Sequence, residues 1–185
     1  AAGGEVDAME EIRYEGRGPG GVQIVVDVLT DNRNRAASNV RTAFSKNGGA
    51  LGEAGSVTFM WDRVGKIHYP AEAGTEDAVM EAAIEAGAMD VESDLVKPDI
   101  YEDAPGHTIW TAFEDLNDVA EAMSKVLGDP KSTAIVWKPQ SEIELTGESV
   151  GTLFKLLDAL DAEDDVQQVY SNEDISDEDA AQYAS

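Results

Sequence analysis

The order of strand-like and helix-like segments between residues 66 and 138 limits the fold of this chain more than any other feature. Apolar residues alternate where strands are expected and recur every three or four positions where helices are expected. Thr75 and Gly87 are typical of a helix start and a helix end. The predicted elements are strands at 66–69, 89–92, 107–113 and 133–137 and helices at 75–87 and 116–128. This order is the split βαβ arrangement of an α+β sandwich.

The residues on either side supply the same elements in two pieces. Thr30 or Asp31 is the expected cap of a helix that runs to about Lys46. The predicted elements are strands at 10–16, 22–29 and 57–61, a helix at 32–46, a second helix at 149–161 and a last strand at 166–170. The sequence therefore predicts an α+β fold of two ferredoxin-like (split βαβ) sandwich domains, one inserted in the other. The expected boundaries are 5–65 with 139–185 for the outer domain and 66–138 for the inserted one.

Two features of the outer domain complete this prediction. Val57, Phe59 and Trp61 alternate as if along one strand, and residues 62–65 are expected to turn it into the next strand. The acidic end from Glu173 is expected to be a solvated tail.

Composition excludes several classes of site. The 185 residues contain no cysteine, which excludes disulfides, thiol catalysis and cysteine-based metal sites. The only histidines, His68 and His107, lie beside strand residues and are expected to be structural or solvent-facing. The longest apolar runs, such as 22–26, are too short to cross a bilayer, and no signal peptide opens the chain. We expect a soluble, cytoplasmic protein with no cofactor and no metal.

Charge is distributed unevenly along the chain. Lys and Arg number 13 against 38 Asp and Glu, a net charge of −25. Residues 1–66 hold 8 basic and 9 acidic residues, whereas residues 156–185 hold 10 acidic residues and no basic one. Between Arg13 and Lys46, six basic residues meet only three acidic ones. The chain as a whole would be repelled by phosphate backbones, so this segment is the expected place of any anion contact.

Two glycine motifs match patterns found in enzymes, but neither has the neighbouring elements that the enzyme pattern requires. The run at 16–21 (GRGPGG) matches GxGxxG, but a strand rather than a helix follows, so dinucleotide binding is not expected. A tight turn whose amides form an anion nest is the preferred interpretation of Gly16, Gly18, Gly20 and Gly21. The run at 147–151 (GESVG) matches GxSxG around Ser149, but both histidines precede it, which is the wrong order for a nucleophile elbow.

The helix at 32–46 is the most informative segment for binding. Ala36, Val40 and Phe44 form its buried face. Arg35, Asn39, Thr42 and Lys46 share one polar stripe, with Arg33 at the helix start and Arg41 on the opposite shoulder. The stripe offers only donors and neutral groups, which suits phosphate or RNA contacts; an ordinary solvent face is the equally weighted alternative.

Several short motifs in the first sixty residues closely resemble the YebC/PmpR family. They are Tyr14-Glu15-Gly16, Gly18-Pro19-Gly20-Gly21-Val22, Leu29-Thr30-Asp31-Asn32-Arg33-Asn34-Arg35, Val40-Arg41, Phe44-Ser45-Lys46, Gly48-Gly49, Leu51-Gly52 and Gly55-Ser56-Val57. The ending Val169-Tyr170-Ser171-Asn172 also fits. Two departures are Arg17, where the family usually has an aromatic residue, and Trp61, where phenylalanine is usual.

The resemblance implies a three-domain protein. A basic helical N-terminal domain, absent from this chain, would precede two α+β domains, the last inserted into the middle one. Family members are labelled DNA-binding transcriptional regulators. Mitochondrial relatives are translational activators, including that of cytochrome c oxidase, and bacterial relatives are linked to stalled ribosomes. No enzymatic activity belongs to the family.

These observations favour a non-enzymatic, nucleic-acid-binding regulator of transcription. The alternative is a translation factor that associates with the ribosome and its RNA, and a remoter one is a small-ligand sensor domain. The expected partner is DNA, ribosomal RNA or the ribosome, bound with help from the absent domain, by a monomer with no membrane contact. The candidate contacts are Arg17, Arg33, Arg35, Asn39, Arg41, Thr42 and Lys46, with the glycine turn beside them.

Overall fold

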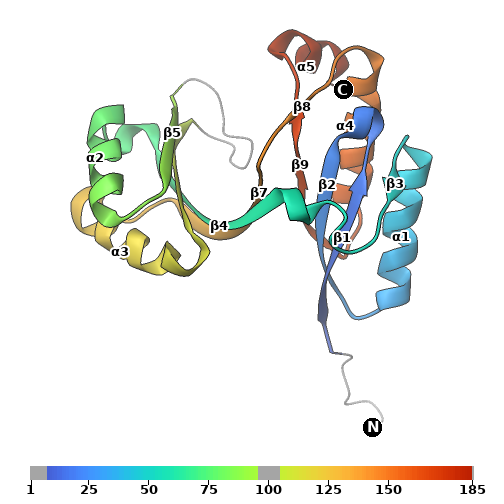
Figure 1. Cartoon of the computed structure of the whole chain (residues 1–185), viewed down its shortest axis with the longest axis horizontal. Helices are drawn as coiled ribbons and strands as arrows, with labels where there is room; N and C mark the ends of the chain where they lie inside the picture. The colour runs from blue at the N-terminus through green and yellow to red at the C-terminus, as the bar shows by residue number, and fades with distance from the viewer. Residues whose placement is uncertain (1–7, 96–104, 185) are drawn as a thin grey trace. The chain divides into compact units, whose positions relative to one another are not determined.

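The computed structural model describes residues 8–95 and 105–184, and the chain divides into two compact units (Figure 1). Unit 1 comprises Ala1–Asp62 and Pro139–Ser185, and unit 2 comprises Arg63–Lys138. Each unit has a four-stranded sheet and its own helices. The α+β class predicted from the sequence is confirmed.

Unit 2 has the strand order of a ferredoxin-like sandwich. Its elements are β4 (Trp61–Pro70), α2 (Glu76–Ala86), β5 (Asp90–Asp94), β6 (Gly106–Ala112), α3 (Leu116–Leu127) and β7 (Ser132–Pro139). The sheet order is β5-β6-β4-β7, so β6 lies between the two strands that α2 connects. The central strands β4 and β6 are antiparallel, with Ile67 opposite Ile109. These two side chains form the core with Val79 of α2 and Met123 of α3, all fully buried.

Unit 1 reaches an equivalent order by a different chain path. Its elements are β1 (Glu10–Arg17), β2 (Gln23–Thr30), α1 (Arg33–Lys46), β3 (Ala50–Leu51), β8 (Ile143–Glu144), α4 (Glu148–Asp161), β9 (Val166–Ser171), β10 (Glu173–Asp174) and α5 (Asp177–Tyr183). The main sheet order is β3-β1-β2-β9. The N-terminal strand β1 thus occupies the place that the third strand has in a ferredoxin-like sheet. Val22 and the alternate β2 residues up to Val28 share one core with Phe44 of α1 and Leu153 of α4.

The segment predicted as a third strand at 57–61 is a loop. Val57 is fully buried and Trp61 is 4% exposed, but Phe59 is 68% exposed and lies in a 3-10 turn at Thr58–Met60. The predicted turn at 62–65 is also wrong, because β4 runs unbroken from Trp61 to Pro70. The physical reason is that the N–H groups of Val57 and Thr58 donate to the Glu15 carboxylate and not to a neighbouring strand.

The cap predicted for α1 is displaced by one or two residues. Asn32 is the N-cap, and its side-chain oxygen accepts a hydrogen bond from the Arg35 N–H at 3.0 Å. Thr30 is buried, and its hydroxyl oxygen accepts from the Asn32 N–H at 3.0 Å. Thr30 therefore shapes the turn before the helix, while Asn32 satisfies the helix end.

The acidic C-terminal end is not a solvated tail. β10 pairs in parallel with β8, with Glu173 opposite Ile143. Ile175 and Tyr183 pack against the core of unit 1, and the Tyr183 ring lies over Gly151 of α4. The two apolar side chains among the acids anchor this end, although the acids themselves are mostly exposed.

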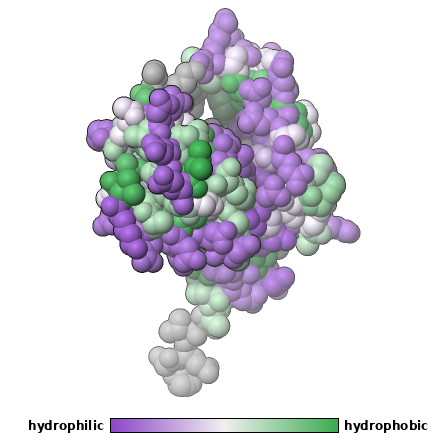
Figure 2. Space-filling model, turned by 60° about the vertical axis from the view of Figure 1, so that its left-hand side comes forward, coloured by the Kyte–Doolittle hydropathy of each residue, from purple (hydrophilic) through white to green (hydrophobic). Residues whose placement is uncertain are grey.

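Large apolar side chains are exposed at several positions in the described part of the chain. Unit 2 exposes single large apolar side chains, among them Ile84 at 67% and Val126 at 66%. On the face drawn in Figure 2, hydrophobic areas are interrupted by hydrophilic residues. None of the described helices has both the length and the apolar character that spanning a bilayer requires.

We expect unit 1 to fold without unit 2. The Gln140 N–H donates to the Met60 carbonyl at 3.0 Å, so the two chain ends left by removing Arg63–Lys138 lie close together. A short glycine-serine linker can then replace unit 2 without moving them. Circular dichroism and thermal unfolding of this variant should show a folded protein with a cooperative transition. An unfolded chain would contradict the independence of unit 1.

Candidate nucleic-acid interface

Helix α1 is the basic element of unit 1, and its ends are well defined. Its 14 residues include four cations and no carboxylate. Ala36, Val40, Ala43 and Phe44 face the core. The helix ends at Asn47, whose side-chain NH₂ donates to the Ala43 carbonyl at 2.8 Å. The packed face fixes the orientation of the helix, so its polar side chains are presented to solvent at fixed positions.

The structure places Arg35 in an ion-pair network on the surface. Its guanidinium donates to Asp31 at 2.8 Å and to both carboxylate oxygens of Asp165 at 3.0 and 3.1 Å. Hydrogen bonds to Asp31 and Asp165 raise the pKa of Arg35, so it stays cationic. This network ties the start of α1 to the loop between α4 and β9, a separation of 130 residues in sequence.

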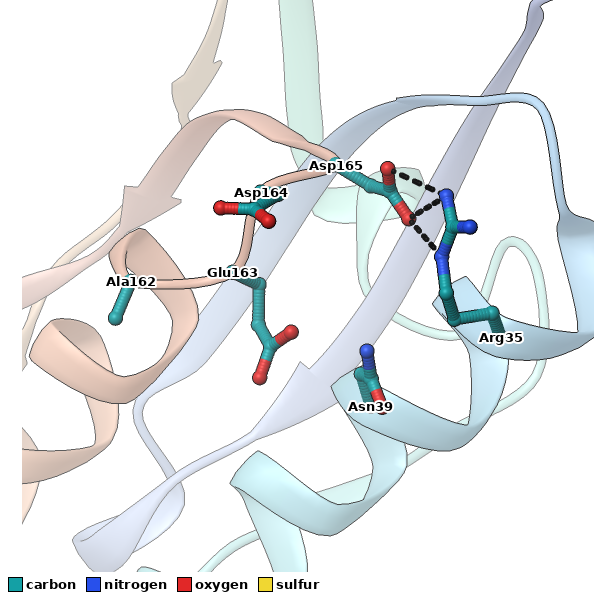
Figure 3. Close-up of a pocket in the computed structure, with 6 residues that line it drawn as sticks. All are labelled: Arg35, Asn39, Ala162, Glu163, Asp164 and Asp165. Carbon is teal, nitrogen blue, oxygen red and sulfur yellow. Dashed lines mark hydrogen bonds and ion pairs between the residues drawn. The ribbon is translucent and has the colours of Figure 1, made fainter.

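Arg35 and Asn39 line an open pocket of about 340 Å³ together with residues 162–165 (Figure 3). Glu163 and Asn39 point into the space between the loop and α1, while Arg35 is turned toward Asp165. Three carboxylates, of Glu163, Asp164 and Asp165, line the pocket with a single guanidinium. An acidic lining repels phosphate, so this end of the predicted stripe is the less suitable half for a nucleic acid.

The other predicted contact residues differ in whether they form an ion pair within the protein. Arg33 pairs with Glu10 at 3.0 Å on the exposed surface. Arg41, Thr42 and Lys46 are exposed, and within residues 8–95 and 105–184 neither Arg41 nor Lys46 has an ion pair. The C-terminal half of α1 therefore presents two unpaired cations with a hydroxyl between them, on opposite shoulders of the helix.

Two residues of the glycine turn pack against helices: Gly16 against Phe44 of α1, and Gly18 against Leu156 of α4. The Gly18 N–H donates to the Val22 carbonyl at 2.8 Å, and the Gly21 N–H donates to the Gly18 carbonyl at 3.2 Å. A Cβ at Gly16 would lie 2.6 Å from the Phe44 ring, which only glycine avoids. Gly20 has a φ of 70°, a left-handed conformation that also favours glycine. Two of the turn's amides thus already have acceptors, and an anion would depend on Arg17 beside them.

Glu15 has a structural role that the sequence analysis did not predict. Its side chain has no solvent exposure, and its two carboxylate oxygens accept from the N–H groups of Gly55 (2.7 Å), Val57 (3.0 Å) and Thr58 (2.7 Å). Arg13 Nε donates to it at 3.2 Å. The sequence signal that could have identified it is the position of an acidic residue in the motif Tyr14-Glu15-Gly16 of a strand. A carboxylate on a buried strand needs several hydrogen-bond donors.

The pKa of Glu15 follows from this environment. Burial alone would raise the pKa, but the three backbone N–H donors outweigh burial and lower it from 4.5 to about 2. A carboxyl with a lowered folded-state pKa stabilises the fold fully above its unfolded pKa. That contribution, about 3 kcal/mol from the shift, is lost as pH falls from about 4.5 toward 2.

The enzyme-like motifs acquire no catalytic setting. His107 is buried: its Nε2–H donates to the Gly74 carbonyl at 3.1 Å, and the Ser93 hydroxyl donates to its Nδ1 at 2.7 Å. His68 is also fully buried, so neither histidine is solvent-facing. Ser149 lies in the first turn of α4, half-buried. Among the described residues, no group of three or more histidines and carboxylates is placed to hold a metal ion.

We expect Glu15→Gln to destabilise the protein by roughly 1–3 kcal/mol at pH 7, because the new NH₂ group faces backbone donors. The difference from the parent should shrink as pH falls from about 4.5 toward 2, because the unfolded parent takes up a proton on Glu15 in this range while the folded parent does not until about pH 2. Chemical denaturation across this pH range measures both effects. Glu11→Gln, on the exposed part of the same strand, is the matched control and should change stability by less than about 0.5 kcal/mol. Equal stability of the Glu15 variant and the parent at pH 7 would contradict the assigned role.

Comparisons with known proteins identify one family model and two similar proteins. The family model described as TACO1/YebC second and third domain matches residues 9–173. A relative from Maricaulis maris (strain MCS10), named probable transcriptional regulatory protein, is 54% identical over 182 residues, which is 98% of this chain and 71% of the relative. The crystal structure of a conserved hypothetical protein from Aquifex aeolicus is similar with a TM-score of 0.81 and 40% identity, covering 94% of this chain and 69% of that one.

Proposed function

The chain belongs to the TACO1/YebC family, and on that premise we propose that it is a non-enzymatic regulator of gene expression that acts by contacting nucleic acid. The name of the Maricaulis maris relative, probable transcriptional regulatory protein, supports the regulatory role. The two units described here then supply contacts and positioning rather than chemistry, which agrees with the burial of both histidines.

The observation that carries the proposal is the charge of α1. In a chain with net charge −25, this helix has four cations and no carboxylate. Acids from other elements neutralise Arg33 and Arg35, which leaves Arg41 and Lys46 as its open cations. Exposed cations beside a hydroxyl are the groups that most often contact phosphate oxygens. We therefore assign the nucleic-acid contact to the C-terminal half of α1, with Thr42 between the two charges.

Ribosomal RNA is the second candidate target, and the net charge favours it over free duplex DNA. Non-specific binding to duplex DNA depends on the release of counterions by many cations, which this chain lacks. A folded RNA whose charge is already partly neutralised by proteins and ions repels an acidic chain less. A translation role through the ribosome follows from this target, and a transcriptional role follows from DNA.

Arg41→Glu with Lys46→Glu should weaken binding without unfolding the protein. Two attractive phosphate contacts become repulsive, so the slope of log affinity against log salt should fall by about 2. Stability should stay within about 0.5 kcal/mol for each exposed site. Co-sedimentation with ribosomes at a series of salt concentrations measures the slope, the nucleic acid that co-purifies with the chain is a second measure of binding, and thermal unfolding measures stability.

The matched control for this variant is Lys125→Glu with Lys155→Glu. It makes the same change in net charge at exposed lysines of two other helices, α3 and α4. Equal loss of binding in both variants would show a general charge effect and would refute the assignment to α1. Parent-like binding of the α1 variant would refute it as well.

We expect the chain to have negligible affinity for random duplex DNA at physiological salt. Non-specific binders show dissociation constants of roughly 10⁻⁴ to 10⁻⁶ M through their basic surfaces. Fluorescence anisotropy with a labelled duplex tests this directly. Tight, salt-sensitive binding would overturn the argument from net charge, which favours ribosomal RNA over free duplex DNA.

A further inference from the structure

The loop between β3 and β4, residues 52–60, has its backbone fixed at both ends and in the middle. The Gly52 N–H donates to the Glu15 carbonyl at 2.8 Å, and the Glu15 carboxylate holds three further amides of the loop. At the other end, the Met60 carbonyl accepts from the Gln140 N–H at 3.0 Å. A loop held in this way is ordered before any partner binds, which lowers the entropy lost on binding.

This fixed loop presents one aromatic ring to solvent. Val57 on one side is fully buried, and Trp61 on the other is 4% exposed, with its Nε1–H donating to Gln23 at 2.8 Å. Phe59 between them is 68% exposed. No other large apolar side chain of the loop is exposed. A single exposed Phe is common on protein surfaces. Phe59 differs because the buried Glu15 carboxylate fixes the backbone just before it, so the ring is a pre-organised contact group.

An arginine contacts the backbone of the same loop. Arg17 Nη2 donates to the Ser56 carbonyl at 3.4 Å, three residues before Phe59. Arg17 is exposed and has no ion pair within the described residues. The loop thus combines a flat apolar face with a cation, and it lacks the wider apolar surface that a protein pocket would cover.

We propose that the loop 52–60 binds an unpaired nucleotide, with the base stacked on Phe59 and a phosphate held by Arg17. Unpaired bases of RNA are recognised by stacking on aromatic side chains, whereas the bases of a duplex are stacked on one another and unavailable. The inference rests on the proposed function, because it assumes a nucleic-acid partner. It adds a contact that distinguishes single-stranded from double-stranded nucleic acid. This contact is separate from the phosphate contacts proposed for α1.

The test compares variants of Phe59 by fluorescence anisotropy with a labelled single-stranded RNA of mixed sequence at low salt. Phe59→Ala should weaken binding about 5-fold or more, the range known for loss of one stacked base. Phe59→Trp should retain binding, because it keeps an aromatic face, and Phe59→Leu should not. Phe113→Ala, which removes another exposed Phe (52%) in unit 2, is the matched control and should bind like the parent. Thermal unfolding of each variant excludes a folding defect.

Three results would overturn the inference. They are parent-like binding by Phe59→Ala, equal binding by Phe59→Leu and the parent, and no binding of single-stranded RNA by the parent. The second result would indicate an apolar contact with a protein rather than base stacking. The α1 variant separates the two proposals. If it loses co-purifying nucleic acid while Phe59→Ala binds normally, the proposed function stands and this inference fails.

Discussion

The buried carboxylate of Glu15 is the interaction on which the local structure of unit 1 depends. Three backbone N–H groups of one loop converge on a side chain from the middle of β1. The alternative for those amides would be pairing with a strand, and this pairing is what the alternation of Val57 and Trp61 suggests. Because a carboxylate in a dry site needs several donors, the loop adopts a turn that supplies them. Phe59 is turned outward as a consequence.

The parts of the fold that follow local periodicity could be predicted, and those set by distant partners could not. The buried stripe of α1 and the alternation along β2 are local signals, and the structure agrees with both. The place of β1 as the third strand of its sheet depends on the whole topology. Ile175 and Tyr183 lie in a strongly acidic stretch of the sequence, so their packing against the core of unit 1 was not predicted. Tyr183 packs on Gly151 of α4, which is distant in sequence.

The same distinction applies to the candidate site. The stripe of Arg35, Asn39, Thr42 and Lys46 was correct as helical geometry, but its charges depend on the rest of the chain. Asp165 lies 130 residues from Arg35 in sequence and forms an ion pair with its guanidinium. No rule based on sequence spacing predicts this pair. A sequence pattern therefore identifies where cations stand on a helix, and only the fold shows which of them are already paired.

The acidic character of the chain gives this pairing a functional meaning. Carboxylates outnumber cations about three to one, and in the described residues they form ion pairs with Arg13, Arg33 and Arg35. Each cation that stays unpaired keeps its full charge for an external anion, while the surrounding acids suppress non-specific attraction. A surface of this kind favours a target that matches a few fixed positions over any phosphate backbone. Recognition then depends on geometry: the spacing of Arg41 and Lys46 along a packed helix and the orientation of a loop held by Glu15.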